Sequence, residues 1–301
     1  MIEEGFLTAL KKTGVKYATD EPMSKHCSFR AGGPADVLAM PGDEEEIAAV
    51  AALAQNYDLP LTVLGSCTNV LVKDRGIRGV TLKIGGGPTK VLILENGMYC
   101  QAGLPLSAAA QKAAASGLAG LEFLYGIPGS VGGGVCMNAG AYGGEIKDFI
   151  VEVDSLDLAG KRSARPAAEL AFGYRASAFL SGGEIITGAR LRLAAGESEQ
   201  IKAKMEEFLR KRQAAQPLEM PSAGSAFKRP PDNFAGKLIE QAGLCGLAVG
   251  GARVSEKHAG FIVNAAGASA ADILRLMEQV AARVYKTFGV PLEPEIRIIG
   301  E

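Results

Sequence analysis

Apolar and polar positions in the first third of the chain predict alternating helices and strands. Asp43 and Glu46 have the spacing of a capping box at a helix start. The residues that follow form an apolar stripe at helical spacing, namely Ile47, Val50, Ala51 and Ala54. Strand-like runs occur at 61–65 and 80–84. A cluster of breaker residues at 85–88 then predicts a boundary between two lobes.

The middle of the chain continues this alternation. A second helix is predicted at 106–116, where Gly117 suits a left-handed C-terminal cap. Strand-like segments recur at 149–158 and 184–193, on either side of the motif FGYRAS. Because both kinds of element occur throughout, the pattern predicts an α+β fold.

The last hundred residues are mainly helical in pattern. Ser198 opens a long helix that ends before Pro217, and a shorter helix is predicted at 233–242. Ser269 and Asp272 have capping-box spacing at the start of a third helix. Its buried stripe is predicted to consist of Ile273, Leu276, Met277, Val280, Val284 and Phe288.

The change of pattern near residue 196 predicts two domains. A chain of 301 residues corresponds to about two domains of roughly 150 residues each. We place them at 1–196 and 197–301, and we divide the first into lobes of about 1–84 and 85–196.

Charge and cysteine content exclude several classes of function. The 32 basic and 33 acidic residues give a net charge of −1, so we expect no nucleic-acid partner and no anionic membrane partner. The basic residues at 202–212 are interleaved with glutamates, which predicts a solvated helix face. Five cysteines without a CxxC pair, together with two histidines, predict neither a metal site nor a disulfide framework. Without an apolar leader or a long apolar run, we expect a cytoplasmic protein.

Two segments rich in glycine and small residues are candidates for ligand binding. LGSCTNVLV, at 64–72, can turn consecutive backbone N–H groups toward an anion, and the alternative is a polar turn between strands. GIPGSVGGGVCMNAGAYGGE, at 126–145, has eight glycines in twenty residues. It matches neither a Rossmann fingerprint, nor a P-loop, nor a nucleophile elbow. Together the two segments predict a dinucleotide held by a fold other than the Rossmann fold.

Seven motifs in collinear order then carry a family resemblance that extends from about residue 25 to 301. They are HCSFRAGGPADVL, LGSCTNVLV, GLEFLYGIPGSVGGGVCMNAGAYGGE, YRAS, PSAGSAFKRPPDNFAGKLIEQAGL, VSEKHAGFIVN and LEPEIRIIG. In this order they resemble the UDP-N-acetylenolpyruvoylglucosamine reductase family, in its shorter type without the substrate-covering loop insertion.

The resemblance implies a flavoenzyme of peptidoglycan precursor synthesis. NADPH would reduce FAD, and the reduced flavin would pass a hydride to the enolpyruvyl group of a small-molecule UDP-sugar, giving UDP-N-acetylmuramate. The implied fold is a two-lobed FAD-binding domain of the vanillyl-alcohol-oxidase/PCMH type, followed by a smaller α/β substrate-binding domain.

The same resemblance implies the site residues. The first glycine segment would hold the FAD pyrophosphate and the second would line the adenine side, through Leu64, Gly65, Ser66, Thr68, Asn69, Ile127, Pro128, Gly129, Ser130, Gly132 and Gly133. The catalytic positions are matched by Arg175, Ser225 and Glu295. Weaker candidates for contact with substrate or NADPH are Tyr142, Gln216, Lys228, Arg229, Lys257 and His258.

The chemistry makes the three catalytic residue types sensible. Addition of hydride to an enol ether conjugated to a carboxylate develops enolate charge, which Arg175 can stabilise. Glu295 can help to hold the enol form, and the Ser225 hydroxyl can supply a proton to a strongly basic carbon. If the three did not occur together, Arg175 would be interpreted as a surface charge, Ser225 as a turn or capping residue and Glu295 as an exposed carboxylate.

Two cysteines depart from the family pattern. Cys67 stands where relatives usually have glycine, and a positive φ there would cost about 1 kcal/mol or more. Cys245 stands where the family commonly has a lysine near the substrate diphosphate. Another cation, such as Lys228, Lys237 or Arg253, could take the role of that lysine. These departures leave two alternatives open: an FAD oxidoreductase with another substrate, or a non-catalytic paralogue that binds flavin or a UDP-sugar.

Overall fold

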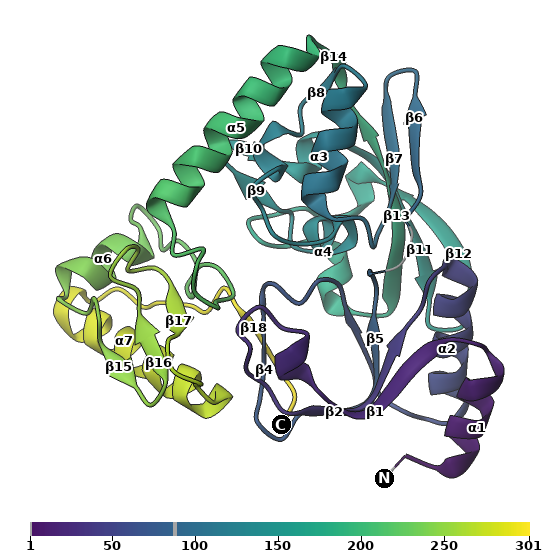
Figure 1. Ribbon diagram of the computed structural model, residues 1–301, viewed down its shortest axis with the longest axis horizontal. Coiled ribbons are helices and arrows are strands. Elements are labelled where there is room, and N and C mark those ends of the chain that lie inside the picture. Colours follow the sequence, from purple (N-terminus) through teal and green to yellow (C-terminus); the bar gives the residue numbers. More distant parts are fainter. Residues whose placement is uncertain (1, 87–88) are drawn as a thin grey trace. The chain divides into compact units, whose positions relative to one another are not determined.

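The computed structural model describes residues 2–86 and 89–301 (Figure 1). Contacts among the described residues divide the chain into two compact units. The first consists of Met1–Thr19, Val37–Ser66 and Gly79–Arg212, and the second of Asp20–Asp36, Cys67–Arg78 and Gln213–Glu301. Long helix α5 therefore groups with the first unit as far as Arg212. The functional division at 196/197 stays a prediction.

The N-terminal part of the first unit is a small sheet with two helices. A four-stranded sheet has the order β1-β2-β5-β3, in which β3 and β5 run parallel. Its elements are α1 (Glu4–Lys12), β1 (Lys16–Pro22), β2 (Pro34–Met40), α2 (Glu44–Asn56), β3 (Leu61–Leu64) and β5 (Ile77–Lys83). Apolar residues of α1 and α2 pack with Val80 and Leu82 of β5 into one core. The apolar stripe predicted for α2 is buried as expected.

The predicted capping box of α2 is formed only in part. Asp43 accepts a hydrogen bond from Glu46 N at 2.9 Å, as expected for the N-cap residue. The Glu46 carboxylate, however, accepts from Gly42 N at 2.6 Å. In a complete capping box Glu46 would accept from the backbone N–H of Asp43, and here it accepts from the residue before it.

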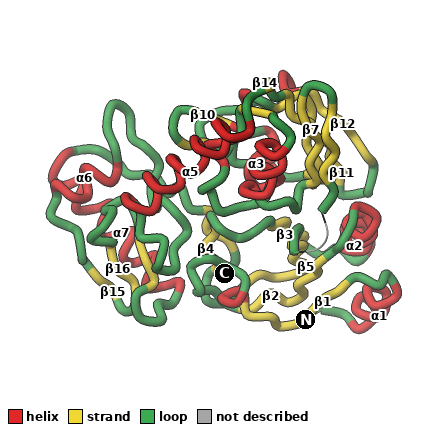
Figure 2. The backbone as a smooth tube through the Cα atoms, turned by 45° about the horizontal axis from the view of Figure 1, so that its top comes forward, coloured by secondary structure: helices red, strands yellow, loops and turns green. Residues whose placement is uncertain are grey.

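The rest of the first unit is built on an antiparallel sheet of order β12-β11-β13-β7-β6. Its elements are β6 (Val91–Leu94), β7 (Gly97–Gln101), α3 (Leu106–Ala115), α4 (Val131–Cys136), β11 (Ile150–Asp157), β12 (Arg162–Pro166), β13 (Glu184–Arg192) and α5 (Ser198–Ala215). Short pairs join β8 (Leu118–Ala119) to β14 (Ala194–Ala195) and β9 (Gly140–Ala141) to β10 (Gly144–Glu145). Helices α3 and α4 bury their apolar residues in the core of this sheet. Figure 2 shows α3 beside the strands of the sheet.

The second unit contains a three-stranded sheet and two helices. Its elements are β4 (Val70–Val72), α6 (Ala235–Gln241), β15 (Ala248–Val249), β16 (Ala252–Val254), β17 (Ile262–Asn264), α7 (Ala270–Phe288) and β18 (Arg297–Ile299). β18 pairs in parallel with β4, which ties the C-terminal segment to the strand that follows the first glycine segment.

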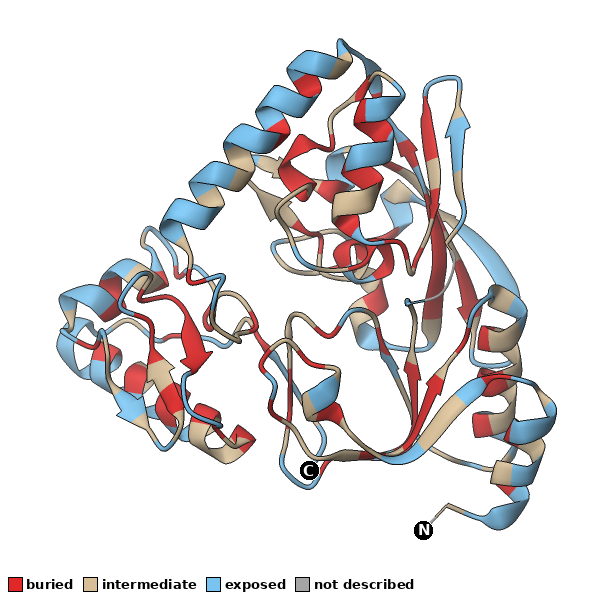
Figure 3. Cartoon of the chain, in the orientation of Figure 1, coloured by how far each residue is buried: buried red, intermediate tan, exposed pale blue. Residues whose placement is uncertain are grey.

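Helix α7 begins and ends as the sequence predicts. Ser269 and Asp272 form a reciprocal capping box, and Gly289 adopts a left-handed φ of 69° at the end. The Asp74 carboxylate adds a second cap, because it accepts from the backbone N–H of Ala270 and Ala271 at 2.8 Å each. Buried residues line one side of α7 and exposed residues the other (Figure 3). Phe288, predicted in the buried stripe, is exposed; it is the last residue of the helix, where the buried side of α7 ends at Val284.

The predicted α+β class is confirmed, and most element boundaries move by only one to three residues. Of the predicted lobe boundary at 85–88, residues 87 and 88 lie outside the described part of the chain. No helix within the described residues is long and apolar enough to cross a membrane.

Candidate functional site

The two glycine segments meet inside the first unit. Gly65 follows β3, and a Cβ added there would fall on the Ser130 Oγ atom. Ser130 is itself buried and caps α4 by accepting a hydrogen bond from Gly133 N at 3.3 Å. Gly129, one residue earlier, has a φ of 153°, which disfavours any side chain. A larger residue at Gly65 would therefore displace the Ser130 hydroxyl that caps α4.

The second glycine segment is anchored to the end of β7. Gly132 N donates to Ala102 O at 2.8 Å, and Leu106 N donates to Gly129 O at 2.9 Å. A Cβ at Gly132 would lie 2.9 Å from Ala102 Cβ, so protein packing alone requires glycine there. The small residues of this segment therefore let its backbone lie directly against the end of β7.

The first glycine segment continues into the second unit. Ser28 donates through its backbone N–H to Cys67 O at 3.2 Å and through its hydroxyl to Thr68 O at 3.4 Å. The Asn69 amide donates to Glu295 O at 3.2 Å, and Asn69 O accepts from Arg297 N at 3.0 Å. The loop and the C-terminal EPEIR segment are thus held together.

Cys67 has the backbone conformation that glycine favours. Its φ is 54°, and its side chain is buried. The positive φ raised in the sequence analysis is therefore present, and a strain of about 1–2 kcal/mol is expected at this cysteine.

Arg175 lies at the third position of a tight turn in the first unit. Gly173 and Ala176 exchange backbone hydrogen bonds across the turn, and Arg175 has a φ of 53°. Its guanidinium donates to Gly140 O at 3.5 Å and lies 5.2 Å from the centre of the Tyr174 ring. The turn therefore directs Arg175 toward the end of the second glycine segment.

Asn138, which sequence reasoning missed, fixes this turn. It is fully buried, and its amide donates to Gly173 O at 2.9 Å and to the Glu145 carboxylate at 3.1 Å. Its Oδ1 accepts from Lys147 N at 3.2 Å. The Ser177 hydroxyl, just after the turn, adds a further hydrogen bond by donating to Cys136 O at 2.8 Å. The only sequence signal was an asparagine within an apolar, glycine-rich run, a position where a polar side chain needs partners.

Arg212 was also missed, because the basic residues at 202–212 were interpreted as a solvated helix face. That interpretation is wrong for Arg212, whose Nε atom is buried without a hydrogen-bond partner in the part of the chain that the structure describes. Burial lowers the pKa of its guanidinium, and the positive charge of Arg175 lowers it further. Four residues earlier on α5, Phe208 stacks on Tyr142 with ring centres 4.6 Å apart. The first unit therefore places Arg212 and Tyr142 in the electrostatic neighbourhood of Arg175.

Ser225 and Glu295 lie on two backbone segments that pair in the second unit. Glu295 N donates a hydrogen bond to the carbonyl of Ala226, the residue after Ser225, at 3.0 Å. Ser225 also forms a bridge with Phe261 on its other side. Arg175 belongs to the first unit, so the structure describes it separately from this pair.

Among the weaker candidates, Gln216 and His258 are the most constrained. The Gln216 Oε1 atom is buried, and residues 2–86 and 89–301 offer it no hydrogen-bond partner. His258 is half-buried, with Nδ1 assigned as the acceptor from Gly260 N at 3.1 Å. Burial lowers the pKa of the His258 imidazole, so it favours the neutral form.

The remaining candidate cations already have protein partners. Lys257 donates to Gln213 O at 2.7 Å, and Lys228 pairs with Glu293 at 3.2 Å. Arg229 lies over the exposed Phe234 ring at 4.5 Å. Cys245 is exposed in the turn after α6, a position open to solvent. All of these remain predictions as substrate contacts.

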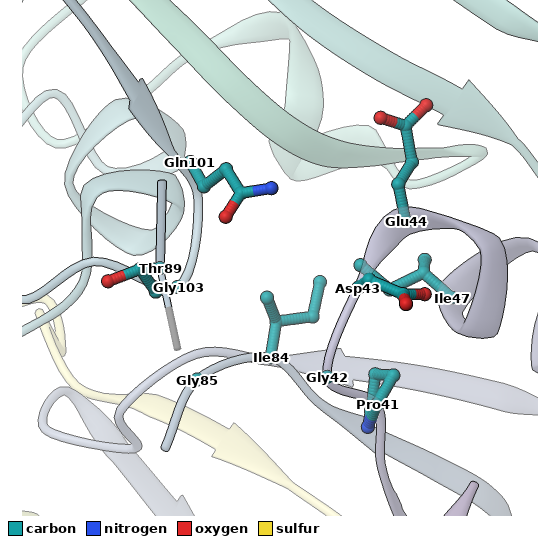
Figure 4. A pocket seen from close by; sticks show the side chains of 10 residues that line it. All are labelled: Pro41, Gly42, Asp43, Glu44, Ile47, Ile84, Gly85, Thr89, Gln101 and Gly103. Carbon is teal, nitrogen blue, oxygen red and sulfur yellow. The ribbon is translucent and has the colours of Figure 1, made fainter. Parts of the chain in front are cut away.

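A small pocket of about 30 Å³ opens in the first unit (Figure 4). Its polar groups are engaged: Asp43 caps α2, and the Gln101 amide oxygen accepts from Lys90 N at 2.6 Å. No residue predicted to bind cofactor or substrate lines it.

Comparisons with known proteins match both parts of the chain. The profile of the UDP-N-acetylenolpyruvoylglucosamine reductase C-terminal domain matches residues 216–299, and that of an FAD binding domain matches residues 35–163. The UDP-N-acetylenolpyruvoylglucosamine reductase of Agathobacter rectalis is 48% identical over 294 residues, covering 94% of this chain and 93% of the relative. That of Lactococcus lactis subsp. cremoris is 44% identical over 301 residues, covering 100% of both chains.

A solved structure shows the same similarity. The crystal structure of UDP-N-acetylenolpyruvylglucosamine reductase (MurB) from Thermus caldophilus superimposes with a TM-score of 0.80 at 36% identity. The match covers 94% of this chain and 98% of that chain. The similarity thus extends over both units and over every predicted site residue.

Proposed function

The chain belongs to the UDP-N-acetylenolpyruvoylglucosamine reductase family, and from that premise we propose that it reduces UDP-N-acetylglucosamine enolpyruvate to UDP-N-acetylmuramate. FAD is the bound cofactor, NADPH the reductant, and peptidoglycan precursor synthesis the setting in the cytoplasm. The observation that supports the proposal is the backbone hydrogen bond between Glu295 and Ala226, the residue after Ser225, in a chain that matches a family member along its whole length.

The two glycine segments are the proposed FAD site. Residues at 64–69 and 127–133 present backbone and small side chains, and a Cβ at Gly65 or Gly132 would collide with the neighbouring segment. When bound and reduced, FAD supplies the hydride for the substrate. Leu64, Ile127 and Pro128 offer apolar contact, whereas Ser66, Thr68, Asn69 and Ser130 offer hydroxyl and amide groups.

Arg175 is the proposed partner of the substrate carboxylate. Hydride addition at the β-carbon of the enolpyruvyl group develops negative charge on the carboxylate attached to the α-carbon. A guanidinium can bind both oxygens of that carboxylate. The left-handed turn and Asn138 fix its position before substrate arrives. Arg212 is half-buried, and its charge interacts with that of Arg175. It therefore adds to the positive potential that attracts the anionic substrate.

Ser225 is the proposed proton donor, and Glu295 is proposed to stabilise the enol form of the substrate. The backbone bond between Ala226 and Glu295 keeps the two segments that carry these residues in register. Asn69 joins the same cluster through Glu295 O, which links it to the cofactor loop. Gln216, Lys228, Arg229, Lys257, His258 and Tyr142 are proposed as contacts with the rest of the substrate or with NADPH.

The test is the flavin content of the purified protein and its NADPH oxidation. We expect FAD to be released on denaturation, and NADPH to be consumed only when the enolpyruvyl sugar is added, with UDP-N-acetylmuramate as product. Bound FAD with turnover on another acceptor would support a different substrate. Bound FAD without turnover would support a non-catalytic paralogue, and absence of FAD after reconstitution would refute the proposal.

A further inference from the structure

His258 closes a tight turn with its own side chain. Its Nδ1 atom accepts a hydrogen bond from the backbone N–H of Gly260 at 3.1 Å, and its carbonyl accepts from Phe261 N at 2.9 Å. A backbone N–H can only donate, so Nδ1 is unprotonated and the proton of the neutral ring lies on Nε2. The side-chain hydrogen bond of this turn therefore exists only while the imidazole is neutral.

The turn and helix α6 are packed closely around the imidazole ring. A Cβ atom added at Gly260 would lie 2.9 Å from His258 Cε1, and one added at Gly236 of α6 would lie 3.4 Å from the same atom. The Phe261 ring meets the imidazole edge to face, with ring centres 4.9 Å apart. A shift of the imidazole therefore has to move the turn, the start of α6, or both.

The same turn carries the backbone that pairs with Ser225. Gly260 O accepts a hydrogen bond from Ala226 N at 2.8 Å, and Phe261 forms an antiparallel β-bridge with Ser225. All of these residues belong to the second unit. The position of the Ser225 backbone therefore depends on the shape of the turn at 258–261.

From the side-chain hydrogen bond, the packing and this backbone pairing, we infer that His258 is a positioning residue for Ser225. The inference rests on the proposed function, in which Ser225 supplies the proton, and it needs no contact between His258 and the substrate. The neutral imidazole holds the turn against the backbone of Ser225. Protonation places an N–H on both ring nitrogens, so the hydrogen bond from Gly260 N is lost and the turn opens.

The surroundings of the imidazole set the pH at which this happens. Burial lowers the pKa of His258, and the Glu240 carboxylate on α6 acts in the opposite direction. The other charged side chain on α6 is Lys237, and the residues before the turn, Glu256 and Lys257, are exposed. Because burial has the larger effect, His258 is neutral at pH 7 and becomes charged below its ordinary pKa of about 6.5.

The first test is the pH dependence of kcat for wild type and His258→Asn, between about pH 5 and 8.5. An asparagine side-chain oxygen can accept from the N–H two residues further on, as Nδ1 does here, but it does not titrate. Wild-type kcat should fall below about pH 6.5 with the uptake of one proton. His258→Asn should lack this fall and keep kcat at about pH 8 within about threefold of wild type.

His26→Asn is the matched control, since His26 is the second of the two histidines of the chain and pairs with Glu21 at 3.0 Å. Its kcat should fall with pH as in wild type.

The second test asks whether His258 acts through Ser225. His258→Ala removes both the acceptor and the ring, and kcat at about pH 8 should fall by about 10- to 100-fold, as for a displaced catalytic group. Reduction of bound FAD by NADPH should keep its wild-type rate, because the proposed role of Ser225 begins after that step. In the background of Ser225→Ala, the His258→Ala substitution should cause no further loss of kcat.

Two outcomes would overturn the inference. One is an equal loss of kcat from His258→Ala with and without the Ser225 hydroxyl, and the other is a fall of kcat at low pH that persists in His258→Asn. If His258→Ala does not fold, the pH profiles of wild type and His258→Asn decide the question. A wild-type enzyme that does not turn over the enolpyruvyl sugar would instead refute the proposed function.

Discussion

Removing the Asn138 side chain should release the turn that positions Arg175. The Asn138 amide group makes three hydrogen bonds, to Gly173, Glu145 and Lys147. At about 1 kcal/mol each, their loss in Asn138→Ala should lower the free energy of unfolding by about 3 kcal/mol. The φ of 43° adds about 1 kcal/mol, because asparagine tolerates left-handed backbone better than alanine does.

The effect on activity should be larger than the loss of stability suggests. Arg175 sits two residues beyond Gly173, whose carbonyl Asn138 holds. A displacement of about 1 Å in such a group can lower kcat/KM by about 100-fold. We therefore expect Asn138→Ala to be folded at 20 °C, to keep FAD and to lose about two orders of magnitude in kcat/KM.

The assay combines urea unfolding with steady-state NADPH oxidation, and Asn264→Ala is the matched control. Asn264 is also buried and makes two side-chain hydrogen bonds, to Phe29 O and from Ala268 N, in the second unit. Asn264→Ala should lower the free energy of unfolding by about 2 kcal/mol and leave kcat/KM within about threefold of the wild-type value. Equal losses of activity in both variants, or wild-type activity in Asn138→Ala, would refute the positioning role.

Three further changes test individual features. Asp74→Ala should lower the free energy of unfolding by about 1–2 kcal/mol in urea, because it uncaps the first turn of α7; an unchanged midpoint would contradict this. Cys245→Lys should lower KM for the sugar with kcat unchanged, since a diphosphate contact binds ground and transition states alike; an equal or higher KM would show that the role is already filled or absent. Because the pKa of His258 is lowered in the fold, the unfolded chain binds more protons, and stability should fall as pH drops below about 6.5. His258→Asn should flatten that dependence in thermal melts, and an unchanged slope would exclude His258 as its source.

The sequence predicted those features whose signals are local. The capping box of α7, the left-handed glycine after it and the glycine segments each depend on a few adjacent residues. The family resemblance then supplied the roles of Arg175, Ser225 and Glu295.

What the sequence did not predict depends on contacts between distant segments. Asp74 caps a helix that begins 196 residues later, and Asn138 holds a turn 35 residues away. Arg212 lies in a run of charges typical of a solvated helix, and only packing shows that its Nε is buried. The segment 67–78 groups with the C-terminal unit because β4 pairs with β18. The segment 20–36 also groups there, and Asn264 donates to Phe29 O within it.

The most direct measurement of the proposed chemistry is a single turnover in deuterated water. Enzyme reduced with one equivalent of NADPH is mixed with the enolpyruvyl sugar, and flavin reoxidation and product deuterium are followed for wild type, Ser225→Ala and the nearby control Ser222→Ala. We predict that wild type and Ser222→Ala reoxidise rapidly and place one solvent deuterium at the α-carbon. Ser225→Ala should be reduced normally by NADPH but reoxidise about 10²–10⁴-fold more slowly. Reoxidation of Ser225→Ala at the wild-type rate, with undiminished deuterium at the α-carbon, would contradict Ser225 as the proton donor.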